Sequence, residues 1–179
     1  MIFTPLSLLG AYIVDIKPLT DDRGFFARSF CMNQFSDHKL RTNIAQCNIS
    51  FNAKRGTLRG MHFQTPPKAE AKLVRCTRGR IHDVIIDLRP ESPTYCRWEA
   101  VEMSGSDHRA LYIPERFAHG FQTLEDETEV FYQMFEFYSP DHAAGVRWDD
   151  PAFGIRWPLP EPIISDRDRS YPLYGRRQG

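Results

Sequence analysis

The densest group of polar side chains lies at residues 59–64, which read Arg-Gly-Met-His-Phe-Gln, and Lys72 follows shortly after. Alternate residues of a strand share one face, so His62 and Gln64 should point to the same side. A charged group among apolar strands needs a partner or a ligand. The group as a whole predicts a ligand pocket, although His62 alone could be a core histidine with satisfied hydrogen bonds.

Arg59 poses a geometric problem for that pocket. Strict alternation places Arg59 on the face opposite His62. The two can face one pocket only if the chain bends or bulges near Gly60, and glycine permits such a bulge. We therefore predict a β-bulge at this point.

Two further polar groups occur later in the chain. Residues 114–121 contain His119, and residues 164–168 contain Asp166 and Asp168. Gly56 and His62, with Pro114 and His119-Gly120, follow the outline of the two cupin motifs.

A metal-binding cupin would carry a second histidine at the position of Gln64. Two histidines and an amide beside an ammonium make a poor divalent-metal site, so we expect no metal. Lys72 is then the available cation. The alternative of another enzyme class is a metal-dependent cupin oxygenase.

The composition narrows the class of protein. The chain has 179 residues, with 23 Lys and Arg against 23 Asp and Glu, and 41% hydrophobic residues. A zero formal charge argues against nucleic-acid or anionic-membrane partners. No apolar run reaches the length of a membrane span, and residues 1–14 lack the basic start of a secretory signal. Four separated cysteines favour free thiols in a reducing cytoplasm.

Many short apolar segments separated by Gly, Pro and Asp predict an all-β fold. The expected strands are residues 11–16, 25–30, 44–50, 58–64, 72–77, 80–88, 98–103, 111–113, 120–124 and 129–138. One helix is expected over Asn33–Arg41, with Asn33 as its N-cap. Residues 1–174 should form a single domain, and residues 175–179 a flexible tail.

The expected strand 129–138 is apolar on both faces. Val130, Tyr132 and Met134 share one face, and Phe131 and Phe135 share the other. Such a strand cannot have a wet side. We expect it to lie between a lined cavity and a second sheet or a partner subunit, which suggests a barrel with a pocket and a dimer.

With these residues in view, the chain resembles the dTDP-4-dehydrorhamnose 3,5-epimerase family over nearly its whole length. The resembling segments are residues 22–26, 46–50, 57–64, 72–74, 83–89, 92–94, 114–121, 148–151, 155–158 and 165–168. The ordered set is more specific than any one segment. The resemblance implies a cupin-type jelly roll with a few short peripheral helices, a homodimer, and no cofactor.

The family substrate is a 4-keto-6-deoxyhexose on a nucleoside diphosphate, whose C3 and C5 hydrogens are acidic because they lie next to the ketone. The resemblance implies that His62 is the base, supported by Asp168, while Tyr132 is the acid on the far side and Lys72 stabilises the enolate. Substrate contacts are implied for Arg23, Phe26, Arg28, Gln46, Asn48, Arg59, His119 and Tyr138.

From the residues alone, simpler roles stay open. Tyr132 could be only a packing residue, Arg23 and Arg59 could form surface ion pairs, and Asp166 could replace Asp168.

Two positions depart from the family pattern. Arg28 stands where thymidine-specific members carry an acidic residue, and arginine cannot accept the imide N–H of thymine. CDP and GDP sugars are therefore alternatives to dTDP sugars. Residues 133–137 are less polar than is typical, which leaves open inversion at one centre, or ketoisomerisation. A non-catalytic sugar-binding cupin is the alternative outside enzymes.

Overall fold

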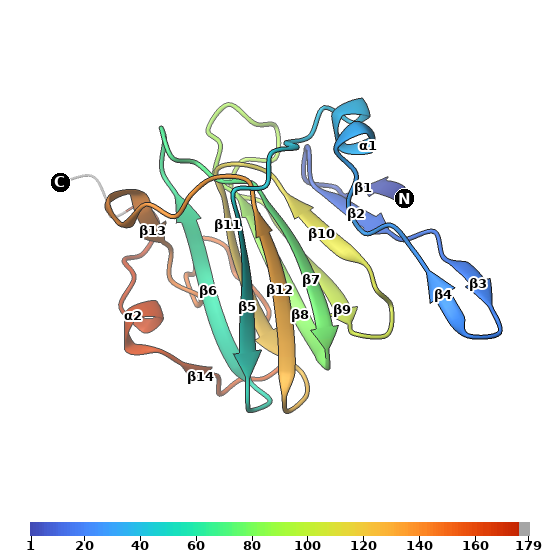
Figure 1. The fold of residues 1–179 in the computed structure, drawn as a ribbon. Coiled ribbons are helices and arrows are strands. Elements are labelled where there is room, and N and C mark those ends of the chain that lie inside the picture. The colour runs from blue at the N-terminus through green and yellow to red at the C-terminus, as the bar shows by residue number, and fades with distance from the viewer. Residues whose placement is uncertain (176–179) are drawn as a thin grey trace.

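The computed structural model describes residues 1–175, in which two antiparallel β-sheets face each other (Figure 1). The first sheet has the order β1 (Ile2–Pro5), β2 (Tyr12–Asp15), β10 (Ala110–Ile113), β7 (Lys72–Arg78), β12 (Thr128–Met134) and β5 (Gln46–Asn52). The second has the order β13 (Ala143–Gly145), β6 (Thr57–Gln64), β11 (Phe117–Thr123), β8 (Arg80–Asp87) and β9 (Trp98–Ser104). This is the expected jelly roll.

Smaller elements lie around the two sheets. The strand β14 (Ile163–Ile164) pairs with β6 in parallel, and β3 (Leu19–Asp21) and β4 (Gly24–Phe26) form a separate hairpin. The helical elements are α1 (Met32–Asp37), the 3₁₀ turn η1 (Pro140–His142) and α2 (Asp166–Arg169). They are the few short peripheral helices that the resemblance implied.

The main core fills part of the space between the sheets. Strand alternation turns every second side chain inward, and the inward residues of both sheets are apolar. The fully buried members include Val74, Cys76, Leu111, Ile113 and Val130 from the first sheet, and Ile81, Ile85, Met103, Phe117 and Phe121 from the second.

The outer face of each sheet is covered by a different segment. Phe35 of α1 packs in a cluster with Leu73 on the first sheet. Val146 and Phe153, from the segment after β13, pack in a cluster with Met61 on the second sheet. Both sheets are therefore buried on two sides over part of their area, which explains why their strands read as apolar runs.

The helix differs from the expected range Asn33–Arg41. It runs only over Met32–Asp37, its N-cap position is Cys31, and no side chain caps it. The expected Asn33 cap is therefore wrong. Lys39 adopts a positive φ of 59° directly after the C-cap residue, and this left-handed conformation ends the helix early.

Three strand boundaries also differ from expectation. The expected strand 25–30 is only the short β4, β11 begins at Phe117 rather than residue 120, and β12 ends at Met134 rather than residue 138. Beyond β12, Phe137 is 61% exposed, so the doubly apolar pattern does not stay buried to its end. Residues 176–179 of the expected tail lie outside the described residues, and the single-domain assignment stays a prediction.

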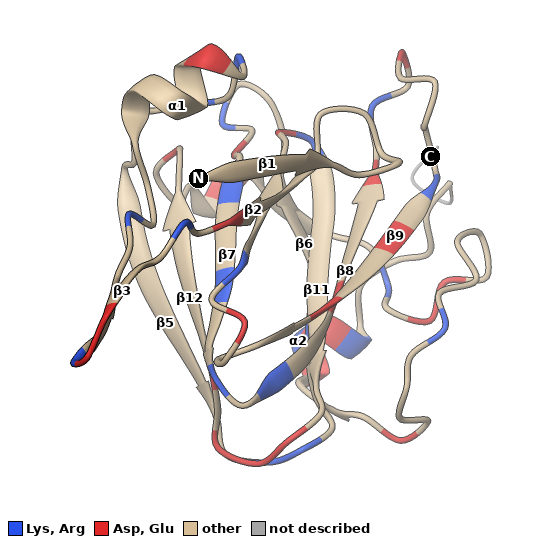
Figure 2. Cartoon of the chain, turned by 90° about the vertical axis from the view of Figure 1, so that its right-hand side faces the viewer, with Lys and Arg blue, Asp and Glu red and all other residues tan. Residues whose placement is uncertain are grey.

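Charged residues of both signs lie close together over the molecule, mostly in turns and at strand ends (Figure 2). Several form surface ion pairs, such as Arg147 with Asp149. Within residues 1–175, every helix is too short or too polar to pass through a membrane.

A buried carboxylate organises the turn after β8. Asp87 is fully buried and accepts hydrogen bonds from the side chains of Arg89, Ser92 and Thr94 at 2.5–2.8 Å. Arg89 also donates to the Leu9 carbonyl at 2.7 Å. Burial raises the pKa of Asp87, but these donors outweigh it and lower the pKa to about 2.

Asp87→Asn should destabilise the fold, because it removes the charge that these donors surround. The folded-state pKa is lowered, so the stabilisation is present above the unfolded-state pKa near 4 and is lost as the pH falls toward 2. We expect a loss of about 3 kcal/mol at pH 7. The difference in unfolding free energy between the wild type and the variant should be smaller by about 1 kcal/mol at pH 3 than at pH 7.

Urea unfolding of both proteins at pH 7 and pH 3 measures this difference. Asp149→Asn is the matched control, because its ion pair with Arg147 lies at the surface and should contribute less than about 1 kcal/mol. A gap between wild type and Asp87→Asn that stays constant with pH would contradict the assignment.

Candidate active site

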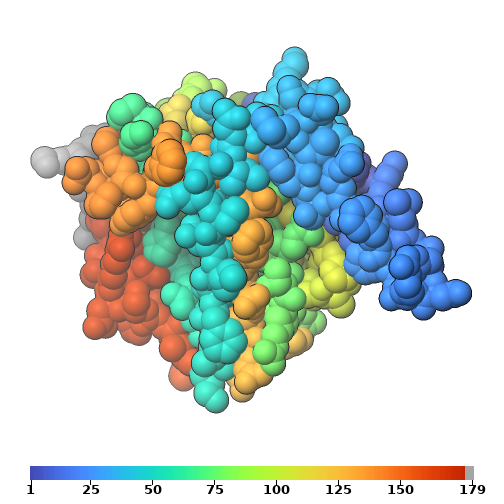
Figure 3. Space-filling view, in the orientation of Figure 1, coloured from blue at the N-terminus to red at the C-terminus, as the bar shows by residue number. Residues whose placement is uncertain are grey.

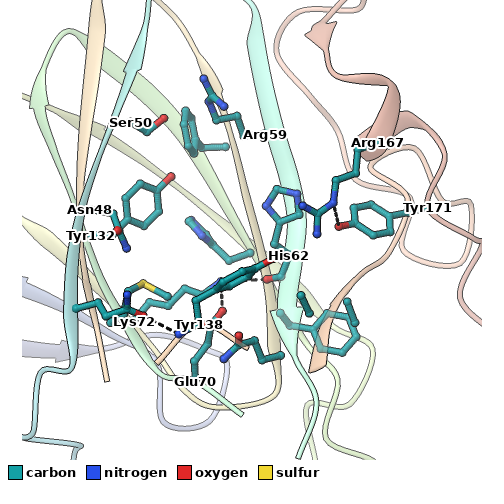
Figure 4. A pocket seen from close by; sticks show the side chains of 18 residues that line it. Asn48, Ser50, Arg59, His62, Glu70, Lys72, Tyr132, Tyr138, Arg167 and Tyr171 are labelled. Atoms are coloured by element: carbon teal, nitrogen blue, oxygen red, sulfur yellow. Dashed lines mark hydrogen bonds and ion pairs between the residues drawn. The ribbon is translucent and has the colours of Figure 1, made fainter. Parts of the chain in front are cut away.

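A cavity of about 520 Å³ opens between the two sheets, a volume suited to a small-molecule ligand (Figure 4). Its walls combine polar and aromatic side chains. The lining residues are Gln46, Asn48, Ser50, Arg59, His62, Phe63, Gln64, Glu70, Lys72, His119, Phe121, Tyr132, Met134, Tyr138, Ala143, Ala144, Arg167 and Tyr171. Eight of the twelve residues assigned to the site from sequence are among them.

The predicted bulge near Gly60 is confirmed. His119 pairs with His62, but Phe121 pairs with Arg59, so the register of β11 on β6 shifts between these pairs. Gly60 has a φ of +141°, and a Cβ there would lie 2.5 Å from the Gly120 Cα. Both glycines are needed for this close approach of strands. The shift lets Arg59 and His62 line the same cavity.

His62 is held by Asp168, which comes from α2 at the far end of the sequence. His62 Nε2 lies 2.7 Å from Asp168 Oδ1, and the Gly60 N–H donates to Asp168 Oδ2 at 3.2 Å. Burial opposes ionisation of Asp168, but these partners hold its pKa below the usual value. A carboxylate there fixes the proton of neutral His62 on Nε2, leaving Nδ1 as the basic atom. Asp166, the alternative partner, is exposed.

Tyr132 lies across the cavity from His62, on β12 of the opposite sheet (Figure 4). Burial raises the pKa of its phenol well above the usual value, and the nearby charge of Asp83 acts in the same direction. The hydroxyl therefore stays protonated at neutral pH and can donate a proton. The Tyr132 ring also packs against the core between the sheets, so its role as an acid stays a prediction.

His119 completes the wall between these two rings. Its Nε2 lies 3.0 Å from the fully buried carboxylate of Asp83. Its ring packs edge-on against Tyr132, with 6.0 Å between the ring centroids. Asp83 thus orients His119 and also raises the pKa of the phenol, although sequence reasoning assigned it no role in the site.

Lys72 brings a positive charge to the cavity wall. Its Nζ donates to the His62 carbonyl at 3.1 Å and lies 3.0 Å from Glu70 Oε1. Gln64 donates to the carbonyls of Lys68 and Phe137 and accepts from the Ser139 N–H, so its amide joins two loops.

Some of the residues implied as substrate contacts line the cavity, and the others lie at the surface away from it. Gln46, Asn48, Arg59 and Tyr138 line the cavity. Arg23, Phe26 and Arg28 do not: they are exposed, and Arg23 pairs with Asp21 at 2.6 Å. The β3–β4 hairpin that carries Arg23 and Phe26 projects from the side of the molecule (Figures 1 and 3).

Sequence reasoning missed several lining residues. Arg167 and Tyr171 come from α2 and the residues after it, and the Arg167 Nε donates to the Tyr171 hydroxyl at 3.1 Å. The Tyr171 ring packs edge-on against His62. Arg167 directly precedes Asp168, and that adjacency was the only available signal. Glu70, two residues before Lys72, was also missed.

Within residues 1–175, no three or more His, Cys, Asp and Glu side chains gather in a way that could hold a metal ion. The two cupin-motif histidines are cross-strand partners, but each directs its Nε2 to a carboxylate, Asp168 for His62 and Asp83 for His119. Gln64 directs its amide to backbone groups.

The model of the dTDP-4-dehydrorhamnose 3,5-epimerase family matches residues 5–175. A curated relative of that name from Methanothermobacter thermautotrophicus is 44% identical over 94% of this chain and 92% of its own. A crystal structure of the Bacillus anthracis enzyme of the same name, with TDP and pyrophosphate bound, is 42% identical, has a TM-score of 0.92, and covers 96% of this chain and 98% of its own.

A third similarity concerns the number of centres inverted. The structure of a 3′-monoepimerase from Streptomyces bikiniensis, in complex with dTDP-quinovose, is 34% identical with a TM-score of 0.87, covering 94% of this chain and 86% of its own. The family match spans every strand of the two sheets except most of β1, and it includes all of the cavity-lining residues. By that match this chain belongs to the dTDP-4-dehydrorhamnose 3,5-epimerase family of isomerases.

Proposed function

We propose that this protein inverts C3 and C5 of dTDP-4-dehydro-6-deoxy-D-glucose, without a cofactor, in the formation of a rhamnose-type sugar. The observation that carries the proposal is the placement of His62 and Tyr132 on opposite walls of one cavity. Inversion requires removal of a proton from one face of the sugar and delivery of a proton to the other.

His62 is the base in this reaction. Nδ1 takes the proton from the carbon next to the ketone, and Asp168 stabilises the imidazolium that forms. The electron pair moves to the ketone oxygen and gives an enolate. Tyr132 then delivers its phenolic proton to the same carbon from the other face. His62 is left protonated and Tyr132 deprotonated, and exchange with water restores both.

The remaining cavity residues bind and stabilise. Lys72 faces the enolate oxygen, where an ammonium lowers the energy of the developing charge. Arg59 and Arg167 are the guanidinium groups lining the cavity among the described residues, and a planar fork suits the diphosphate. Gln46, Asn48, His119 and Tyr138 add polar contacts to the nucleotide sugar.

Inversion at one centre is the second candidate, because a 3′-monoepimerase is among the similar structures. Both reactions use the same base and acid, so the cavity walls suit either. The identity of the nucleobase, thymine, is also a proposal. Arg28, which stands where thymidine-specific members carry an acidic residue, lies outside the cavity of this chain.

We further propose that the enzyme is a homodimer in which the hairpin of each subunit serves the site of the other. Arg23, Phe26 and Arg28 are exposed and away from their own chain's cavity, and Phe26 is 75% exposed. On the outer face of the edge strand β5, Ile49 and Phe51 are also more than half exposed. A second copy would cover this edge.

We assign the protein to the cytoplasm as part of the same proposal. All four cysteines, Cys31, Cys47, Cys76 and Cys96, are free thiols, as is usual in a reducing compartment. Residues 1–174 act as one domain in this reading, since strands from both ends of that range build the two sheets.

Incubation with dTDP-, CDP- and GDP-4-keto-6-deoxyglucose in D₂O, followed by NMR, tests the reaction. We expect deuterium at C3 and C5 and inverted products with the dTDP sugar. His62→Asn should slow exchange by about 10²–10⁴-fold. His38→Asn, an exposed histidine on α1's C-cap, should leave exchange unchanged. Exchange at only one of the two carbons would show that the protein inverts a single centre. Binding of the sugar without any exchange would refute the proposal that the protein is an enzyme.

Tyr132→Phe should separate proton removal from inversion. The base is intact in this variant, so His62 can still remove each proton and return deuterium to the same face. We expect solvent exchange with retained configuration, and inverted product reduced by about 10²-fold or more, read from the same NMR spectra. Inversion at the wild-type rate would rule out Tyr132 as the acid.

Mixed dimers test the exchanged hairpin. Arg23→Ala and His62→Ala should each be nearly inactive alone, and refolding them together should create one intact site in each heterodimer. Because half of randomly formed dimers are mixed, the expected recovery is about a quarter of the wild-type rate. No recovery, with heterodimers detected by mass, would mean that the hairpin serves its own chain or none.

A further inference from the structure

Glu70 and Lys72 form a buried ion pair in the wall of the cavity. Glu70 Oε1 lies 3.0 Å from Lys72 Nζ, and the two side chains are 8% and 6% exposed. Both line the cavity (Figure 4). A positive charge buried this deeply needs an opposite charge close by. Glu70 is the carboxylate paired with it among the described residues.

The surroundings fix the direction of the ammonium. Lys72 Nζ donates to the backbone carbonyl of His62 at 3.1 Å. An ammonium has three N–H donors. The carbonyl takes one of them and Glu70 holds the nitrogen by charge, so donor capacity remains for an oxygen in the cavity. The cation is thereby tied to the same residue that carries the basic imidazole.

The loop that carries Glu70 is itself anchored. Gln64, the last residue of β6, donates to the Lys68 carbonyl at 2.8 Å, and its Oε1 accepts from the Ser139 N–H at 2.6 Å. Ala71, which lies between Glu70 and Lys72 in the chain, is buried in the cluster around Phe35 on the outer side of the sheet. Glu70 therefore reaches the cavity from a packed segment.

We propose that Glu70 is a positioning residue, which holds the charged Lys72 ammonium against the His62 carbonyl so that it faces the oxygen of the enolate. This inference rests on the proposed function. The enolate oxygen is shared by proton removal at C3 and at C5. Loss of Glu70 should therefore slow proton removal at C3 and at C5 by the same factor. Loss of a residue that contacts only one part of the sugar would change the two rates unequally.

Glu70→Gln keeps the shape of the side chain and removes its charge. We expect kcat for deuterium exchange to fall about tenfold or more, approaching the 10²–10³-fold effect of losing an oxyanion donor. The factor should be equal at C3 and C5. KM and the Kd for dTDP, measured by calorimetry, should stay within about twofold, because binding is shared with many other groups. Glu70→Asp should recover part of the rate.

A double-mutant cycle with Lys72→Met shows whether Glu70 acts through Lys72. If it does, Glu70→Gln should cause no further loss in the Lys72→Met background. The control is Glu136→Gln, because Glu136 also pairs with a lysine, the more exposed Lys68 at 3.4 Å, and neither residue lines the cavity. That variant should keep the wild-type rate.

The outcomes separate this inference from the proposed function. Wild-type exchange together with full activity of a folded Glu70→Gln variant would overturn the role of Glu70 and leave the epimerase intact. An equal loss in the wild-type and Lys72→Met backgrounds would overturn it as well, and so would a loss confined to KM. Absence of exchange in the wild type would overturn both.

Discussion

The carboxylate of Asp168 connects the two features on which the site depends. One oxygen lies 2.7 Å from His62 Nε2, and the other accepts the Gly60 N–H at 3.2 Å. The first contact determines which nitrogen of the imidazole is basic. The second stabilises the backbone at the bulge, which lets the Arg59 and His62 side chains point into one cavity. Helix α2 thus orients the His62 imidazole and also stabilises the bulged backbone of β6.

Ionisable groups in the cavity wall are paired with a neighbour of matching chemistry. His62 has Asp168, His119 has Asp83, and Lys72 has Glu70. Each pairing offsets the energetic cost of burying a charge. Tyr132 is the contrast, because its phenol stays neutral through burial and the nearby negative charge of Asp83. In the proposed reaction, Tyr132 is a neutral proton donor that faces the base His62, an arrangement suited to inversion at carbon.

Local patterns predicted much of the fold and part of the site. The central strands around the cavity agreed with expectation, because alternation and breaker residues act over a few neighbours. The helix was expected to extend to Arg41, but the left-handed conformation of Lys39 ends it. The strand β12 was predicted too long, since Phe135, Phe137 and Tyr138 continue its aromatic pattern after the backbone has left the sheet. Glu70 offered no signal and Arg167 only its adjacency to Asp168, because their place in the site depends on neighbours that folding brings close.

The sequence by itself determined the class of fold, the motifs of the family and the conditional need for a bulge at Gly60. Those properties follow from residue types and short spacings. The tertiary structure alone decided that Asp168 rather than Asp166 reaches His62, that Asp83 supports His119, and that Arg23 and Phe26 lie away from their own chain's cavity. Each joins residues far apart in the chain, and such distances depend on how the sheets pack and close rather than on any local pattern.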